Sequence, residues 1–379
     1  MRERGPIVRQ LATRNARRRP LIFLAVGLTV ILLFSSASGA WAIPEQTPSR
    51  QTLPTPPPKP PWEPRPGCVQ RGQPYTPHYS SHPHGIGFDV TNGKLYVGNY
   101  NTSNLSVVDI ATGSLLTRLP TGGHSPNGVV VNPSTNMVYV ANRNTYSVGV
   151  IDANTDSLVD TIFVGACPWG VAVNPYTNKI YVVNMGYWTV SVIDGYTNRV
   201  IATPWTDFRP TMVAVNPYTN KIYVADHGSW NVAVIDGATD TTVGIIWLGA
   251  GLGPYGIAVN PLTNRIYVAT KDSGNVAVID GYTDSIITYI KLEKSSFMVA
   301  VNPNTNHLFV THGLHNEVTV IDGATNTVIT ALAVGTNPDD GIVIDTATDR
   351  VYVTNSGSNT VSVIQDGYAP GVVATYSIN

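Results

Sequence analysis

A five-residue motif, Asn-Pro-x-Thr-Asn, recurs along this chain at nearly constant spacing and restricts the fold more than any other feature. Its complete copies begin at Asn132, Asn174, Asn216, Asn260 and Asn302, and degenerate copies begin at Asp89 and Asp345. Successive copies start 42 to 44 residues apart, so the chain contains seven units. A period in the low forties, with about four short strands in each unit, is typical of a β-propeller.

The third unit shows how one repeat is expected to fold. Its apolar and β-branched segments predict four strands, at residues 170–173, 179–184, 190–193 and 199–203. Pro175 and Asn178 suit a tight turn after the first strand, because proline fixes φ and asparagine tolerates the left-handed conformation. Asp194 and Gly195 form the turn after the third strand. The other six units fit the same template.

The second strand of each unit carries a recurring Tyr-Val-x-Asn motif. It is complete at residues 96–99, 139–142, 181–184 and 352–355, and it is altered at 223–226, 267–270 and 309–312. The chain therefore resembles the YVTN β-propeller repeat family of bacterial and archaeal exported and surface-layer proteins, over residues 82–378. The resemblance implies a propeller, and it implies little about chemistry because many members have no established activity.

Ring closure is predicted to need no borrowed strand. Residues 371–378 supply an outer strand for the last unit, whereas residues 68–82 contain Pro74 and Pro77 and lack an alternating pattern. We therefore expect an all-β, seven-bladed propeller of four-stranded antiparallel blades over residues 82–379. The last blade is expected to close the ring by packing its face on the first.

Residues 1–43 are expected to direct export. Seven arginines lie in the first 20 residues, and an uncharged stretch follows from Leu21 to Ile43. The small residues Ala40 and Ala42 favour a cleaved signal peptide, whereas a stretch of this length also suits an uncleaved membrane anchor. Arg18 and Arg19 loosely fit a twin-arginine signal, or form an ordinary cluster on the cytoplasmic side. Each interpretation places the propeller outside the cytoplasm, either secreted or tethered by residues 21–43.

Residues 44–81 form a proline-rich linker and lead-in. Eight prolines lie between residues 54 and 66 and favour an extended polyproline spacer, the alternative being an unselected disordered tail. From residue 72 onward, 12 basic residues face 21 acidic ones. This negative balance argues against nucleic-acid binding, which relies on lysine and arginine.

A binding surface is expected where loops from all blades meet at one end of the channel. The position just before each inner strand differs from blade to blade, unlike the repeated turns. Its occupants are His84, Asn127, Trp169, Thr211, Tyr255, Phe297 and Asp340. The loops between second and third strands add Tyr187, Trp188, His227, Trp230 and His312 to the predicted surface, and they also carry Tyr100, Arg143, Tyr146, Lys271 and His315. Aromatic rings with a few polar groups are typical of recognition surfaces; alternatively, the rings merely close the channel.

Catalytic signatures are sparse. The sequence lacks a His-Glu-x-x-His zinc motif, a nucleophile elbow and a haem attachment motif, so we predict no catalytic residue, metal or cofactor. The aspartates that end six of the third strands are expected to shape turns. If the protein is instead an enzyme, the candidates for base or metal ligand are His84, His227, His312 and Asp340.

Cys68 and Cys167 are the two cysteines of the chain. In an oxidising compartment they could bridge and hold the linker across the loop face, stabilising the fold by up to ~4.7 kcal/mol in the chain-entropy model. The alternative is two separate thiols, if the span across two blades is too great.

The sequence favours a non-enzymatic, extracytoplasmic recognition or scaffold protein that binds a protein or glycan at the loop face. The alternative is a propeller lyase or lactonase-like hydrolase using histidine and aspartate at the channel mouth, which rests on analogy of fold.

Overall fold

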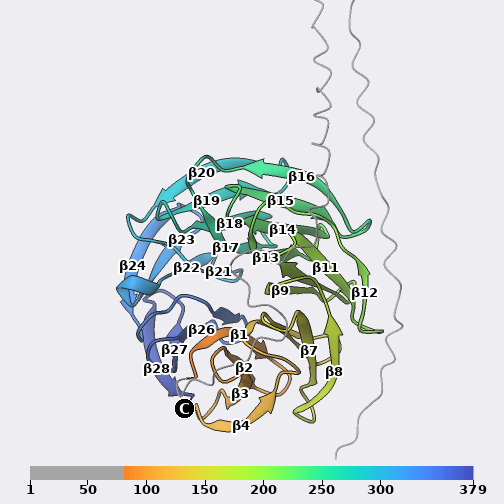
Figure 1. The fold of residues 1–379 in the computed structure, drawn as a ribbon. Helices are drawn as coiled ribbons and strands as arrows, with labels where there is room; N and C mark the ends of the chain where they lie inside the picture. Colours follow the sequence, from red (N-terminus) through yellow and green to blue (C-terminus); the bar gives the residue numbers. More distant parts are fainter. Residues whose placement is uncertain (1–80, 379) are drawn as a thin grey trace, which may run out of the picture. The chain divides into compact units, whose positions relative to one another are not determined.

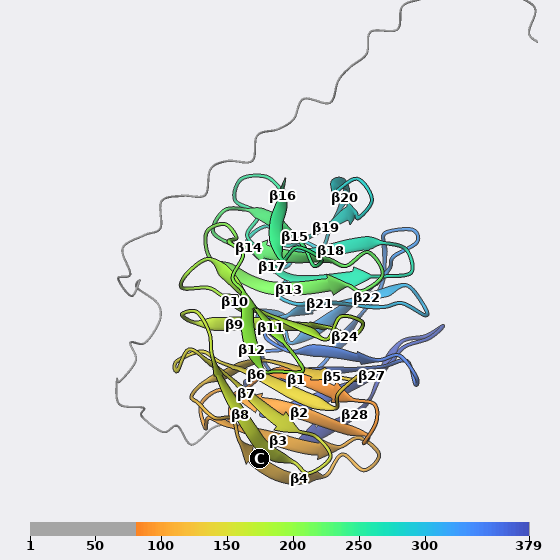
Figure 2. The ribbon, with the colours of Figure 1, turned by 90° about the vertical axis from the view of Figure 1, so that its right-hand side faces the viewer.

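The computed structural model describes residues 81–378, which form seven four-stranded antiparallel sheets, each built from four consecutive strands. The sheets follow one another around a ring with the first strand of each at the centre and the fourth at the rim (Figure 1). Seen from the side, the sheets are stacked as twisted layers (Figure 2). The predicted all-β propeller of seven four-stranded blades is confirmed.

Each blade contributes one strand of each kind. The inner strands are β1 (Pro83–Asp89), β5 (Pro126–Asn132), β9 (Pro168–Asn174), β13 (Pro210–Asn216), β17 (Pro254–Asn260), β21 (Val299–Asn302) and β25 (Ile342–Asp345). The second strands are β2 (Lys94–Asn99), β6 (Met137–Asn142), β10 (Lys179–Asn184), β14 (Lys221–Asp226), β18 (Arg265–Thr270), β22 (His307–His312) and β26 (Arg350–Asn355).

The outer half of each blade is equally regular. The third strands are β3 (Asn104–Asp109), β7 (Ser147–Asp152), β11 (Thr189–Asp194), β15 (Asn231–Asp236), β19 (Asn275–Asp280), β23 (Glu317–Asp322) and β27 (Thr360–Gln365). The outer strands are β4 (Leu115–Pro120), β8 (Ser157–Phe163), β12 (Arg199–Ala202), β16 (Thr241–Trp247), β20 (Ser285–Lys291), β24 (Thr327–Ala333) and β28 (Gly371–Ser377). A short 3-10 helix, η1 (Gly313–His315), lies between β22 and β23.

The core lies between the faces of neighbouring blades. In β10, Ile180, Tyr181 and Val182 are all fully buried, because both faces of a middle strand are covered by other blades. Strand β9 extends beyond the predicted residues 170–173, since Pro168 already pairs with Asn184 after an irregularity in the register. Outer strands bury less, as the half-exposed pattern of β28 shows.

The Asn-Pro-x-Thr-Asn motif repeats because its two asparagines join neighbouring blades. In β9, the Asn174 side-chain oxygen accepts a hydrogen bond from the Tyr176 amide, and its Nδ2 donates to Asn220 Oδ1 of the next blade at 2.7 Å. The fifth residue adopts positive φ in each complete copy, 52° at Asn178 for example. Equivalent side-chain bonds join Asn132 to Asn178, Asn216 to Asn264 and Asn260 to Asn306.

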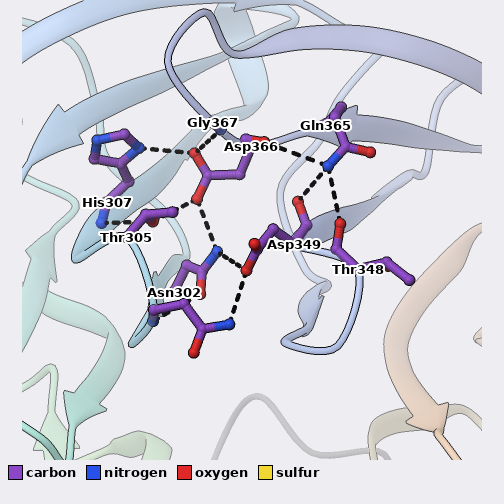
Figure 3. Close-up of polar contacts among 9 residues, drawn as sticks. Asn302, Thr305, His307, Thr348, Asp349, Gln365, Asp366 and Gly367 are labelled. Carbon is purple, nitrogen blue, oxygen red and sulfur yellow. Dashed lines mark hydrogen bonds and ion pairs between the residues drawn. The ribbon is translucent and has the colours of Figure 1, made fainter.

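This asparagine ladder changes between the sixth and seventh blades (Figure 3). Asn302 Nδ2 donates to Asp349 at 2.9 Å and also to Asp366 at 2.8 Å. The wholly buried Asp366 carboxylate receives a further contact from His307 Nδ1 at 2.7 Å. The ladder does not continue on either side of the first blade, because its donor position is Asp345 in the seventh blade and Asp89 in the first, and aspartate has no side-chain N–H to donate. At the closure the acceptor is also lost, since the fifth position of the first copy is Gly93.

Other contacts hold the last blade on the first. The last blade forms its sheet from its own strands β25–β28, as predicted. Across the closure, Thr354 Oγ1 donates to the His84 carbonyl at 2.7 Å and Tyr376 Oη donates to the Ile110 carbonyl at 3.0 Å. Arg118 also donates to the carbonyl of Ile378, whose side chain is fully buried. Closure therefore depends on face packing and side-chain bonds.

Several sequence-based expectations concern the amino-terminal region. The predicted export segment (1–43) and nearly all of the linker (44–81) lie outside the described residues. Within residues 81–378 there is no helix that is long and apolar enough to cross a membrane. Cys167 is disulfide-bonded, and the one other cysteine of the chain, Cys68, lies outside the described residues.

Candidate functional site

The candidate site lies at the end of the ring where the inner strands begin, here called the mouth face. Five of the seven positions predicted before the inner strands are in fact the second residue of a strand that begins with proline, as with His84 after Pro83 in β1. Phe297 and Asp340 precede β21 and β25 by two residues. We call these seven positions the axial residues.

Inner strands touch one another at the axial residues. The Phe297 carbonyl accepts the Gly256 amide at 2.9 Å, and Thr211 Oγ1 donates to the Tyr255 carbonyl at 2.9 Å. A Cβ atom at Gly85 would lie 1.9 Å from the Asn127 carbonyl oxygen, far inside van der Waals contact. The glycines after axial residues therefore allow a narrow collar of backbone around the axis.

Side chains from blades that are not neighbours meet across this collar. Trp169 of the third blade packs edge-on against Tyr255 of the fifth, with ring centroids 6.4 Å apart. Tyr255 Oη in turn approaches Asp340 Oδ1 of the seventh blade at 3.5 Å. Since each pair skips a blade, both contacts cross the axis. Tyr255 is only 9% exposed, so its ring helps to close the mouth.

Two cationic side chains lie on these rings. Lys271 Nζ is 4.8 Å from the Tyr255 ring centroid and 4.5 Å from that of Phe297. The Arg143 guanidinium lies 4.8 Å over Trp169 and donates to Tyr100 Oη at 2.8 Å. Among the described residues, no carboxylate lies within ion-pair distance of Lys271. The cation–π contacts hold positive charge on the aromatic surface.

A row of titratable groups lies beside the rings. His82 Nδ1 is 2.8 Å from His84 Nε2, and His84 Nδ1 is 3.1 Å from Asp340 Oδ2. Burial, with a smaller effect of His82, lowers the pKa of His84 to about 3, so this imidazole is neutral at pH 7. Burial also raises the pKa of Asp340 to about 6. Asp339, the adjacent residue, has its pKa raised to about 6 by burial and by Asp340.

Two further axial residues, Asn127 and Thr211, and the loop residue His227 are held by contacts within the protein. Asn127 is wholly buried, and its side-chain amide has no hydrogen-bond partner among the described residues. Thr211 bridges the carbonyls of Ala225 and Tyr255. His227 comes from the loop after β14, packs edge-on against Tyr255 at 6.2 Å, and lies 3.5 Å from Asp272. Burial is the main cause that lowers its pKa.

The structure places other predicted site residues away from the axis. Trp230 packs on Trp247 at the end of outer strand β16, with ring centroids 6.1 Å apart. Trp188 packs on Phe208 at 5.0 Å, and the neighbouring Tyr187 is 48% exposed. These three side chains therefore form peripheral parts of the mouth face and do not join the axial cluster.

His312 lies inside the sixth blade. It is fully buried, with Nδ1 2.9 Å from the Ser295 carbonyl oxygen and Nε2 2.9 Å from Thr319 Oγ1. It replaces the asparagine that ends other second strands, since Asn184 makes the matching 2.9 Å bond to Ser191. The structure therefore does not bring His312 together with His84. Within the described residues, no group of three or more histidine, cysteine, aspartate or glutamate side chains is placed to hold a metal ion.

Sequence reasoning left four members out of the predicted binding set: His82, Asp339, Arg143 and Lys271. Arg143 and Lys271 already stand among the loop residues of the predicted mouth, where they are the only arginine and lysine in the loops between second and third strands. His82 adopts φ 50°, which a residue pattern does not reveal, and this conformation places it against His84.

The predicted turn role of the aspartates that end third strands is confirmed: Asp194 accepts hydrogen bonds from the amides of Tyr196 and Thr197.

Comparisons with known proteins support the fold alone. No family model matches the chain, and no curated protein matches it. Among solved structures, it is similar to a chain of hydrazine synthase from Kuenenia stuttgartiensis, with a TM-score of 0.72 and 19% sequence identity. The match covers 79% of this chain and 99% of that chain. The class is therefore a seven-bladed β-propeller.

Proposed function

We propose that this protein is a non-enzymatic recognition propeller that binds a protein or glycan partner through the axial residues, with Arg143 and Lys271. Following the family resemblance and the basic, apolar amino terminus, we place it outside the cytoplasm as an exported or membrane-tethered YVTN-type protein. Nucleic acid does not suit its acidic balance.

One observation carries this proposal: Lys271 lies on two aromatic rings, and no carboxylate of the described residues is within ion-pair distance of it. An ammonium group in such a place attracts an anionic group of a ligand, and the half-buried Trp169 and Phe297 rings offer apolar contact beside it. Aromatic anchors at the centre of a surface usually supply most of the binding energy.

Binding to immobilised uronate oligosaccharides and acidic peptides tests this function. We expect the wild-type protein to be retained and Lys271→Met to weaken retention about tenfold or more, since methionine keeps the apolar stem and loses the charge. Lys291→Met, an exposed lysine at the end of β20, is the matched control. Equal behaviour of the two variants, or no retention of the wild type, would remove the axial cluster as a recognition surface.

The second candidate is an enzyme, favoured by the row His82–His84–Asp340–Tyr255. Clusters of buried groups with displaced pKa values often mark active sites. Against this, His84 directs one nitrogen at His82 and the other at Asp340, so neither faces solvent. Titration with divalent metals decides between the candidates: near-stoichiometric binding that is lost in His84→Ala and Asp340→Ala would favour the enzyme.

A further inference from the structure

The end of the ring opposite the mouth, the turn face, exposes large aromatic side chains in the third to fifth blades. The variable position of the Asn-Pro-x-Thr-Asn turn holds Tyr176, Tyr218 and Leu262 there, which are 69%, 59% and 63% exposed. The turns between third and outer strands add Tyr196 and Tyr282, 81% and 79% exposed. Exposed groups of this size and clustering often mark binding sites.

Tyr176 and Tyr218 form a two-ring platform. Their ring centroids are 6.0 Å apart with an interplanar angle of 23°. The Tyr218 hydroxyl raises the pKa of the Tyr176 hydroxyl beside it, which agrees with rings that point the same way. The pairing follows from the fold, because each variable position lies against the next turn: Ser134 Oγ donates to the Pro175 carbonyl at 2.8 Å.

The platform is not needed to build the turn. Ser134 and Asn304 occupy the same position in the second and sixth blades, where the turn has the same first-asparagine hydrogen bond and the same positive φ at its fifth residue. Those blades make their contact with a polar side chain, Ser134 or Asn304. Tyr176 and Tyr218 instead stack on each other and stay largely exposed. Local geometry therefore does not account for the tyrosines.

The charges around the platform nearly cancel. The turns of the third to fifth blades hold five aspartates and four basic residues: Asp194, Asp236, Asp240, Asp280, Asp284, Lys179, Arg199, Lys221 and Arg265. Lys179 and Lys221 are each paired with an aspartate of the next blade at 2.7 Å. A polyanion would find no net positive charge here, whereas an uncharged ligand meets no electrostatic penalty.

We propose that the Tyr176–Tyr218 platform binds the sugar rings of a neutral polysaccharide. The C–H groups on one face of a pyranose ring are slightly positive and suit the negative face of an aromatic ring. Sugar hydroxyls can exchange hydrogen bonds with the tyrosine hydroxyls and with the threonines of these turns. Leu262 continues the apolar surface into the fifth blade, so several units of one chain have a place to bind.

The full-length protein is tested by co-sedimentation with chitin and cellulose, and by affinity electrophoresis in a soluble neutral glucan, with polygalacturonate as the anionic comparison. We expect retention on at least one neutral polymer and at least a tenfold loss in Tyr176→Ala/Tyr218→Ala. Tyr368→Ala is the matched control, because Tyr368 is fully exposed in the seventh blade and outside the platform. Lys271→Met at the mouth should leave retention unchanged, which separates this site from the proposed function.

Three results would overturn the assignment. The first is no retention on any neutral polymer, and the second is an equal loss in the double variant and in Tyr368→Ala. The third is a wild-type dimer in analytical ultracentrifugation that the double variant dissociates, since the platform would then be a contact between two copies. Matching melting temperatures of wild type and double variant would confirm that the substitutions act on binding and not on folding.

Discussion

Asn178 combines a strained backbone with a bond between blades. Its φ is 52°, its side chain is 2% exposed, and its Oδ1 accepts Asn132 Nδ2 of the preceding blade. Asn178→Val should therefore lower the free energy of unfolding by about 2–5 kcal/mol, because a β-branched residue is strained at positive φ and the Asn132 donor loses its partner. Urea unfolding monitored by tryptophan fluorescence measures the change.

The chain offers its own control for this substitution. In the seventh blade, Asp349 holds the same position at φ 54° and accepts Asn302 Nδ2 at 2.9 Å. Asn178→Asp should thus cost less than Asn178→Val, since aspartate keeps the acceptor and tolerates this conformation, and its remaining cost is that of a carboxylate at a site more buried than that of Asp349. If the aspartate variant is destabilised as much as the valine variant, neither strain nor the lost acceptor explains the effect.

Substitution of Trp169 is expected to affect partner binding more than stability, whereas substitution of Asn178 affects stability. Its ring is half-buried under Arg143 and touches Tyr255 by an edge. Trp169→Ala should weaken partner binding by about 2 kcal/mol or more, and it should lower the melting temperature less than Asn178→Val does. The outcome that contradicts a recognition role is a large loss of melting temperature with unchanged binding, which would make the ring a structural plug.

Asp340 should make stability depend on pH in a direction opposite to the turn aspartates. Burial raises the pKa of Asp340 in the folded protein to about 6, above the usual aspartate value of 3.8, so the folded protein holds an ionised carboxylate above pH 6 and a protonated one below it. Asp340→Asn removes this penalty, which is at most about 3 kcal/mol. We therefore expect the variant to be more stable than wild type at pH 8, with the difference vanishing as pH falls below about 4.

The groups facing Asp340 are His84, Asp339, Tyr255, Lys271 and Arg143, and none of these residues is changed in this variant.

Asp194→Asn provides the contrast, since hydrogen bonds from the following turn lower the pKa of Asp194. That carboxylate stabilises the fold above its unfolded pKa and loses this effect as pH falls, so the asparagine variant should be the less stable one at pH 7. Urea midpoints across pH 4–8 compare the two; an Asp340→Asn protein that is no more stable at pH 8 contradicts the assigned burial penalty.

The inner strands are expected to tolerate no side chain where the collar is narrowest. A Cβ at Gly85 in β1 would lie 1.9 Å from the Asn127 carbonyl oxygen of β5, so Gly85→Ala must push two strands apart. We expect a loss of about 1–3 kcal/mol or more in unfolding free energy. Gly244→Ala in outer strand β16 is the control, because its nearest neighbour would be 3.8 Å away and alanine suits a strand better than glycine. A similar loss in both variants would show that close approach is not the cause.

The repeat predicted the propeller because each blade obeys the same local rules. The period set the number of blades, and the turn chemistry of Asn178 and Asp194 followed from preferences that act within a few residues. The axial cluster was predicted only in part, since spacing identifies which positions reach the mouth face but not which side chains cross the axis. The contact between Trp169 and Tyr255 skips a blade, and no local pattern encodes it.

His312 shows that position within the repeat can locate a residue better than the chemistry of its side chain does. It stands where the Tyr-Val-x-Asn motif places asparagine, and this register identified it as a replacement within the blade. Grouping it with loop residues by its chemistry alone placed it on the surface. Its two bonds, to Ser295 and Thr319, show that register within the repeat was the better guide.

The closure between the seventh and first blades should be the place where the ring opens first. The asparagine ladder is absent on both sides of the first blade, because aspartate holds the donor position at Asp345 and Asp89 and has no side-chain N–H. Between the first and second blades, Asp156 instead accepts Lys94 and Tyr96. At the closure the replacing contacts are those of Thr354, Tyr376 and Arg118. Ile378 is fully buried there, and its amide donates to the Asn359 carbonyl. Ile378→Ala should cost about 2–5 kcal/mol and speed hydrogen exchange chiefly in β1, β2, β26 and β28.

Leu248 is the equivalent residue of the fourth blade: it also follows an outer strand, donates its amide across the blade to the Trp230 carbonyl, and is only 4% exposed. Leu248→Ala leaves a similar cavity at an interface that the ladder still joins through Asn216 and Asn264. We therefore expect it to lower global stability by a comparable amount without selective opening of the blades beside it. Hydrogen exchange read by mass spectrometry compares the two variants. If both variants accelerate exchange equally around all seven blades, the closure is not the weakest interface of the ring.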